Sequence, residues 1–137
     1  MAQAPVAHAE AVATPDASLV TTTHAIYALH ALSVLIGLTS AATVIGAFVF
    51  GVPSLLAVVV NYVRRSAVRG TMLESHFRWQ IRTFWFALLW IVLGFVLFAT
   101  LIGIPVAFVV WAAATIWVMY RVGRGWMRLS RLAPMPS

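Results

Sequence analysis

The chain contains no cysteine, no lysine and only three acidic residues among its 137 positions. The absence of cysteine excludes disulfide bridges, thiolate metal sites and thiol catalysis. Charged residues make up only 9% of the sequence and hydrophobic residues 63%, which leaves too little polar surface for a soluble domain of this size. The composition therefore indicates a membrane protein, and the length allows one domain.

All nine basic residues are arginine, and the formal net charge is +6. The arginines form two clusters, within residues 64–82 and 121–131, and each cluster flanks long apolar segments. This distribution is typical of basic residues that stay on the cytoplasmic side and meet anionic headgroups. We therefore predict a multi-pass protein of a bacterial inner membrane with its arginine-rich segments in the cytoplasm. Its partners would be membrane lipids, not nucleic acid.

Two long apolar runs dominate the remaining sequence. The run over residues 25–63 would be nearly 60 Å long as one helix, about twice the hydrocarbon thickness, so it must break. We expect the break at Gly51-Val52-Pro53, because proline removes a hydrogen-bond donor and glycine relaxes the backbone. Gly103-Ile104-Pro105 should divide the second run in the same way.

The resulting prediction is an all-α integral membrane protein built from two helical hairpins. The four transmembrane segments are expected at residues 25–49, 53–64, 72–102 and 105–127. Because the second segment is short, three spans plus a re-entrant half-helix is the alternative. Residues 1–22 and 129–137 are interpreted as a mobile N-terminal tail and a C-terminal tail around a helical membrane domain, residues 23–128.

The beginning of the third segment carries most of the polar chemistry. Thr71 and Glu74 fit a capping box, and Glu74 begins a stripe with two arginines at spacings of four. A second polar stripe lies on another face of the same helix. The candidate contacts with a partner subunit or lipid headgroup are Glu74, His76, Arg78, Gln80, Arg82, Arg64 and Arg121. The alternative is an interfacial helix whose arginines only extend to phosphates.

A few polar and small residues inside the apolar segments are candidates for helix packing. His30 and Asn61 can bond across helices, and small residues four positions apart allow close approach of helix backbones. The candidates are His30, Gly37, Ala41, Gly46 and Asn61. Trp90 and Trp111 are interpreted as packing residues too. A haem between His30 and His76 would require the two side chains to converge; we expect no cofactor.

Four strings carry a resemblance to a known group. They are Glu74 to Trp85 (ESHFRWQIRTFW), Leu29 to Ser33 (LHALS), Asn61 to Arg65 (NYVRR) and Tyr120 to Trp126 (YRVGRGW). Together they resemble short, uncharacterised bacterial membrane proteins placed near the Tic20-like family. The resemblance covers about residues 24–131 and implies a helical membrane protein. Tic20 proteins themselves are associated with protein translocation in plastids.

No catalytic constellation is present, because Glu74 has no second carboxylate to work with and no nucleotide-binding glycine pattern occurs. We therefore expect a non-enzymatic protein, an accessory or assembly subunit of a larger inner-membrane complex. Other membrane subunits or further copies of this chain would be its partners. The alternative is a Tic20-like oligomeric pore or translocation component.

Overall fold

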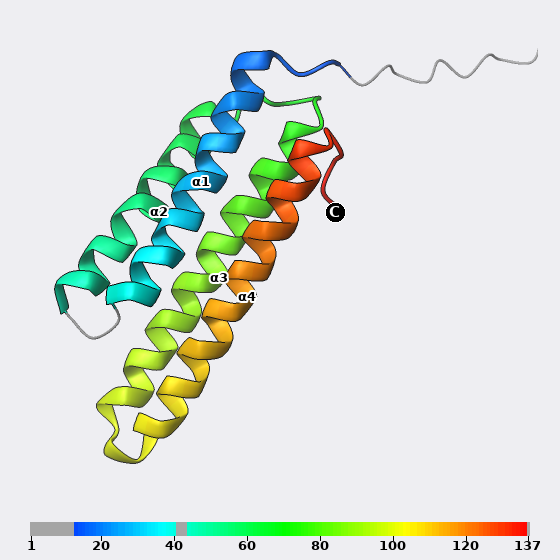
Figure 1. Ribbon diagram of the computed structural model, residues 1–137. Helices are drawn as coiled ribbons and strands as arrows, with labels where there is room; N and C mark the ends of the chain where they lie inside the picture. Colours follow the sequence, from blue (N-terminus) through cyan, green and yellow to red (C-terminus); the bar gives the residue numbers. More distant parts are fainter. Residues whose placement is uncertain (1–12, 41–43, 137) are drawn as a thin grey trace, which may run out of the picture.

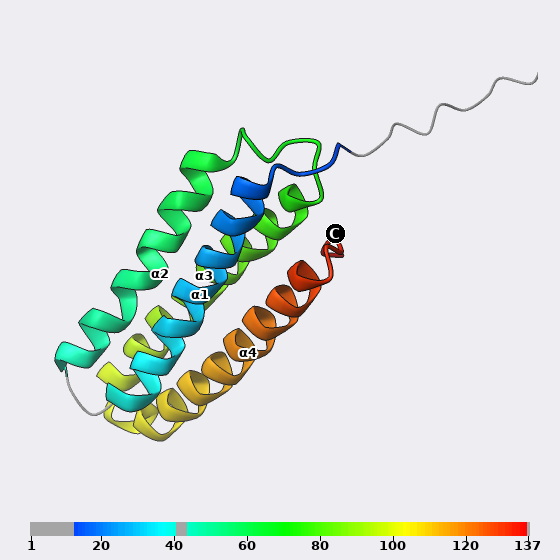
Figure 2. The same cartoon turned by 45° about the horizontal axis from the view of Figure 1, so that its top comes forward.

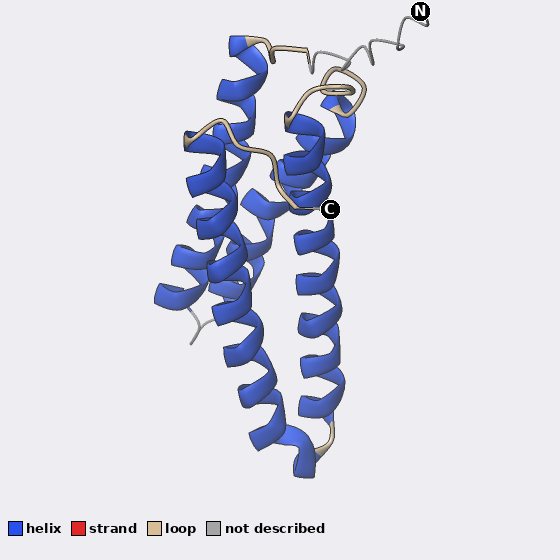
Figure 3. Ribbon diagram, turned by 90° about the vertical axis from the view of Figure 1, so that its right-hand side faces the viewer, coloured by secondary structure: helices blue, strands red, loops and turns tan. Residues whose placement is uncertain are grey.

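The computed structural model describes residues 13–40 and 44–136, and the side chains of these residues apart from 38–50. In these residues the chain is helical and has no strand, which confirms the all-α prediction (Figure 3). The elements are α1 (Ala17–Ser40), α2 (Val44–Arg64), α3 (Leu73–Ala99), the 3₁₀ helix η1 (Leu101–Gly103) and α4 (Ile104–Ser130).

The helices form two antiparallel hairpins, α1–α2 and α3–α4, of unequal length (Figure 1). α1 also packs against both helices of the second hairpin, as the tilted view shows (Figure 2). The α3–α4 hairpin extends well past the end of the first one (Figure 1). Both arginine clusters lie at the opposite end, which we call the arginine end: the end of α2, the beginning of α3 and the end of α4.

Three helices among the described residues are long and apolar enough to cross a membrane: Ala17–Gly37, Leu73–Ala99 and Leu101–Ser130. Helix α2 has 21 residues, but its part with described side chains, Gly51–Arg64, is a shorter apolar helix. The chain is therefore consistent with a multi-pass membrane protein that has three helices long enough to span and a shorter apolar segment in α2.

The expected break at Gly51-Val52-Pro53 is wrong. Helix α2 runs through this triplet with Pro53 in its interior. Membrane helices accept such a proline when neighbouring groups satisfy the freed backbone carbonyl. The first hairpin instead turns between Ser40 and Val44, and the connecting residues 41–43 lie outside the described residues.

The second expected break is confirmed. Helix α3 ends at Ala99, Thr100 is extended, and α4 begins at Ile104 with Pro105 in its first turn. Proline is well placed there, because the first turn of a helix has no partner for its N–H groups. The outer turn of this hairpin carries fully exposed apolar side chains, with Ile102 at 94% exposure.

Both segments that the sequence predicts as tails include structured residues. Helix α1 includes residues 17–22 of the predicted N-terminal tail. Asp16 begins it: its carboxylate accepts hydrogen bonds from the Ser18 amide (3.1 Å) and hydroxyl (3.0 Å), which lower the pKa of the carboxyl group. After α4 the chain turns back (Figure 1) and buries Met135 against the beginning of α3.

The α3–α4 hairpin is held by an aromatic cluster around Trp111. Its ring stacks on Phe98 and meets Phe95 and Phe108 edge to face, and its Nε1–H donates to the Ile91 carbonyl (3.3 Å). The packing role of Trp111 is therefore confirmed. Trp90 is 41% exposed, so its packing role stays a prediction.

Candidate functional site

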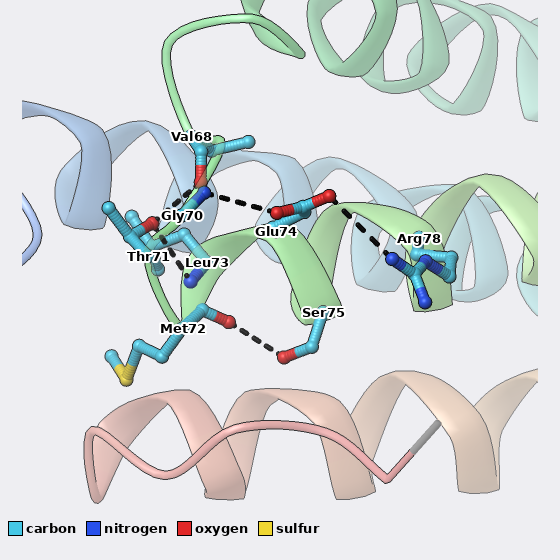
Figure 4. Close-up of polar contacts among 8 residues, drawn as sticks. All are labelled: Val68, Gly70, Thr71, Met72, Leu73, Glu74, Ser75 and Arg78. Carbon is cyan, nitrogen blue, oxygen red and sulfur yellow. Dashed lines mark hydrogen bonds and ion pairs between the residues drawn. The ribbon is translucent and has the colours of Figure 1, made fainter. Parts of the chain in front are cut away.

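The first turns of α3 fix the exposed charged stripe. Gly70 adopts a positive φ of 74°, and its N–H donates to the Glu74 carboxylate (3.1 Å, Figure 4). Thr71 Oγ1 accepts from the Leu73 amide (3.2 Å). The predicted capping box is therefore not formed: the N-cap of α3 is Met72 and not Thr71, it makes no side-chain cap hydrogen bond, and the Glu74 carboxylate accepts from Gly70 in place of Thr71. Glu74 also pairs with Arg78 at 3.6 Å, as the spacing predicted.

A cleft of about 190 Å³ opens beside this stripe at the arginine end. Three arginines reach it, one from the loop directly after α2 and two from α3, together with Glu74 and three apolar side chains. The lining residues are Arg65, Val68, Glu74, Phe77, Arg78, Ile81 and Arg82. One carboxylate against three guanidinium groups leaves a net positive cleft, which suits a carboxylate or phosphate because arginine binds both in a bidentate manner.

A second cationic position lies between α3 and α4. The guanidinium of Arg121 sits 3.5 Å from the ring centre of Trp79 and 4.9 Å from that of Trp117. Its Nε donates to Thr83 Oγ1 (2.7 Å) and its Nη2 to the Trp79 carbonyl (3.4 Å). Four contacts from two helices therefore hold this predicted contact residue in one orientation.

His76 and Gln80 do not belong to the exposed stripe, which corrects the expectation that they meet headgroups or a partner. Both are buried. His76 Nδ1 lies 2.9 Å from the Tyr27 hydroxyl of α1, and Nε2 lies 2.8 Å from the Ala133 carbonyl of the C-terminal segment. The histidine face of α3 therefore points into the bundle, while its arginine face points outward.

Other buried polar side chains lie further along α1 and α3, and we call the whole set the polar seam, although His30 bonds to α2 and Thr83 to Arg121 of α4. The two helices run in the same direction, so the Tyr27–His76 bond sets their register and brings successive polar turns to similar depths. The seam comprises Tyr27, His30 and Ser33 of α1 and His76, Gln80 and Thr83 of α3. His30 also bonds Ser54 of α2 (3.2 Å), which confirms an interhelical role.

Several seam atoms have no hydrogen-bond partner among the described residues. They include both amide atoms of Gln80, Nε2 of His30 and the Ser33 hydroxyl. Asn61 of α2 is fully buried and its amide has no partner among the described residues, so its predicted bond across helices is not seen. Buried polar atoms without partners carry a free-energy penalty of about 1–3 kcal/mol each.

The remaining predicted residues have different outcomes. Arg64 is exposed at the end of α2. Gly37 lies half-buried on α1, Ala41 lies outside the described residues, and Gly46 belongs to the part of α2 whose side-chain surroundings are not described. The small-residue face thus stays a prediction.

Sequence reasoning missed the C-terminal segment as part of this region. The Met135 amide donates to Ser75 Oγ (2.9 Å), and Arg128 donates to the Pro134 carbonyl (3.0 Å). The apolar Met135 among prolines was the available signal, but only the turn after α4 brings it to α3.

No protein-family model, curated protein or solved structure matches this chain. The function must therefore be argued from the residues themselves.

Proposed function

We propose that this chain is a small non-enzymatic protein of the bacterial inner membrane that serves as an accessory or assembly subunit of a larger membrane complex. One feature carries the proposal. An outward stripe on α3 combines arginines with large apolar side chains at alternating spacings of four and three: Arg78, Arg82, Trp85, Leu89, Val92 and Val96. Each of the four apolar members is at least 52% exposed.

The partner that fits this stripe is a transmembrane helix with an acidic residue near its cytoplasmic end. Alternating spacings of four and three form the seam along which two helices pack side by side. Glu74 pairs only with Arg78, and Arg82 has no ion-pair partner among the described residues, so the arginine end of the stripe favours an acidic neighbour. An anionic lipid also joins apolar chains to a negative charge, so the experiment must detect a protein at this stripe.

Site-specific crosslinking tests this docking. A photoreactive residue at position 89 or 92 of α3 should capture one discrete partner protein in cells. The matched control is position 109 or 116 of α4, where Val109 and Ile116 are 67% and 68% exposed. Arg78→Glu should abolish the capture and Arg131→Glu should leave it intact. Equal capture from α4, or capture insensitive to Arg78→Glu, would refute the proposal.

The proposed orientation places the arginine end in the cytoplasm. Because the chain lacks cysteine, Ser66→Cys in the α2–α3 loop and Ile102→Cys in the outer turn provide clean probes. An impermeant thiol reagent should label position 102, and not 66, in spheroplasts. Labelling near residue 14 from the same side would favour three spans plus a half-helix over four spans.

The second candidate is a Tic20-like oligomeric pore or translocation component. The polar seam favours it, because hydrophilic side chains line the inside of the bundle for several turns. Ion conductance of reconstituted liposomes that disappears with Gln80→Leu would support this candidate. Unchanged leak rates with and without the protein would reject it.

A further inference from the structure

Two cations without a counter-charge lie beside Trp79 at the arginine end, Arg121 of α4 and Arg82 of α3. The guanidinium of Arg121 lies over Trp79 and bonds to Thr83, the sequence neighbour of Arg82, and Arg82 lines the same small hollow as Trp79. Of the three acids in the chain, Asp16 caps α1, Glu74 pairs with Arg78, and Glu10 lies outside the described residues. No described carboxylate therefore neutralises this pair.

Arg121 is also fixed before any ligand arrives. Its guanidinium is held over Trp79 and bonded through Nε and Nη2, so little side-chain freedom remains to be lost on binding. Such a preorganised planar group beside a second arginine is suited to phosphate, which accepts several charge-assisted hydrogen bonds.

A small hollow of about 50 Å³ adjoins this position. Trp79 and Arg82 form part of its wall, and Ser75, Arg78 and the C-terminal segment at Met135 and Pro136 complete it. The hollow therefore opens between α3 and the C-terminal segment, and it shares Trp79 with the Arg121 position.

The surroundings indicate that the phosphate belongs to a lipid. Trp79 and Trp117 have the amphipathic character of residues at the headgroup level, and Phe86 of α3 makes an edge contact with Trp117 of α4. Below them the hairpin is apolar apart from Thr100 and Thr115, which suits acyl chains. Basic pockets between transmembrane helices are known to bind anionic headgroups.

We propose that the position between α3 and α4 beside Trp79 is a specific binding site for the phosphodiester of one anionic phospholipid, with Arg121 and Arg82 as its ligands. The site shares Arg82 with the α3 docking stripe but has Arg121 as its key residue, and it does not depend on the accessory role. Unlike general headgroup contact, a specific site should hold one lipid molecule, and that molecule should exchange slowly with the surrounding lipid.

Native mass spectrometry of the full chain in mild detergent tests the site. With phosphatidylglycerol and phosphatidylcholine of identical acyl chains, the wild type should retain one phosphatidylglycerol and bind it at least about tenfold more tightly. Arg121→Gln and Arg82→Gln should each lower this affinity about tenfold. Arg131→Gln, which removes an exposed arginine elsewhere, is the control and should change nothing.

Arg82→Gln keeps the test decisive if Arg121→Gln disturbs the helix pair, because Arg82 has no hydrogen-bond or ion-pair partner among the described residues. Glycerol 3-phosphate in excess distinguishes the two sources of phosphate: it should not displace the lipid from a lipid site. Full displacement would assign the site to a soluble phosphate ester and overturn the proposal. Equal retention of the two lipids, or an unchanged affinity in both glutamine variants, would overturn it too.

Discussion

Gly94→Ala should destabilise the α3–α4 hairpin, although alanine is the better helix former. A Cβ atom at Gly94 would lie 1.9 Å from Trp111 Nε1, 2.5 Å from its Cδ1 and 2.6 Å from its Cε2. The indole cannot easily retreat, because it donates to the Ile91 carbonyl and stacks on Phe98. One added methyl group therefore forces either the ring or the helix pair to move.

The expected magnitude follows from two opposing terms. Alanine in place of glycine favours a helix by about 0.5–1 kcal/mol, whereas overpacking a tight contact typically costs about 1–3 kcal/mol. We expect a net loss of about 1–2 kcal/mol in the free energy of unfolding. Gly123→Ala in α4 is the matched control, because a Cβ there meets nothing within 4 Å. It should be neutral or stabilising by up to about 1 kcal/mol.

Reversible unfolding in mixed micelles, titrated with sodium dodecyl sulfate and followed by tryptophan fluorescence, measures both variants. Trp111→Phe combined with Gly94→Ala should recover part of the loss, since a smaller ring leaves room for the methyl group. If Gly94→Ala and Gly123→Ala had the same stability, the close approach of the two helices at Trp111 would be refuted.

Three further outcomes are expected. Gln80→Leu should raise the free energy of unfolding by about 1–3 kcal/mol in the same titration, because both amide atoms are buried without partners; a loss would show that the amide is hydrogen-bonded in the membrane. Truncation after Arg131 should make His76 reactive towards diethyl pyrocarbonate, read by mass spectrometry, because the Ala133 carbonyl and Met135 no longer cover it. Glu74→Gln should change stability by less than about 0.5 kcal/mol, because its ion pair with Arg78 is exposed; a larger change would show that the carboxylate is needed at Gly70.

Hydropathy and turn chemistry predicted the second hairpin well but misplaced the turn of the first. At Gly103-Ile104-Pro105 the chain leaves one helix and begins another, and proline occupies the first turn, where its missing N–H has no consequence. At Pro53 the same residue type lies inside α2. A continuous apolar run does not specify where it folds, and the residues between Ser40 and Val44 carry no glycine or proline to mark the place.

The polar stripes of α3 show a second limit of sequence reasoning. Helical spacing correctly separated the arginine stripe from the histidine stripe, but it did not predict which of the two stripes faces inward. That choice depends on Tyr27, 49 residues away in sequence, and on the C-terminal segment, 57 residues away at Ala133. Arginine is excluded from a bundle interior without a counter-ion, whereas histidine and glutamine can be buried as neutral groups. This difference in the free-energy cost of burial, more than the helical period, determines which of the two faces is buried.

The two hairpins are joined to each other in the half of the bundle that carries the proposed functional sites, the arginine end. Each described hydrogen bond between helices of different hairpins lies in that half of the bundle: Tyr27 to His76, Trp126 to His24 and Trp85 to Tyr62. The outer half of α3–α4 projects beyond α1–α2 and is held by its own aromatic cluster (Figure 1). A partner helix on α3 or a lipid at Arg121 would therefore act where the two hairpins meet. Buried polar atoms without partners lie in the bundle, and a ligand at the arginine end is well placed to fix the relative position of the two hairpins.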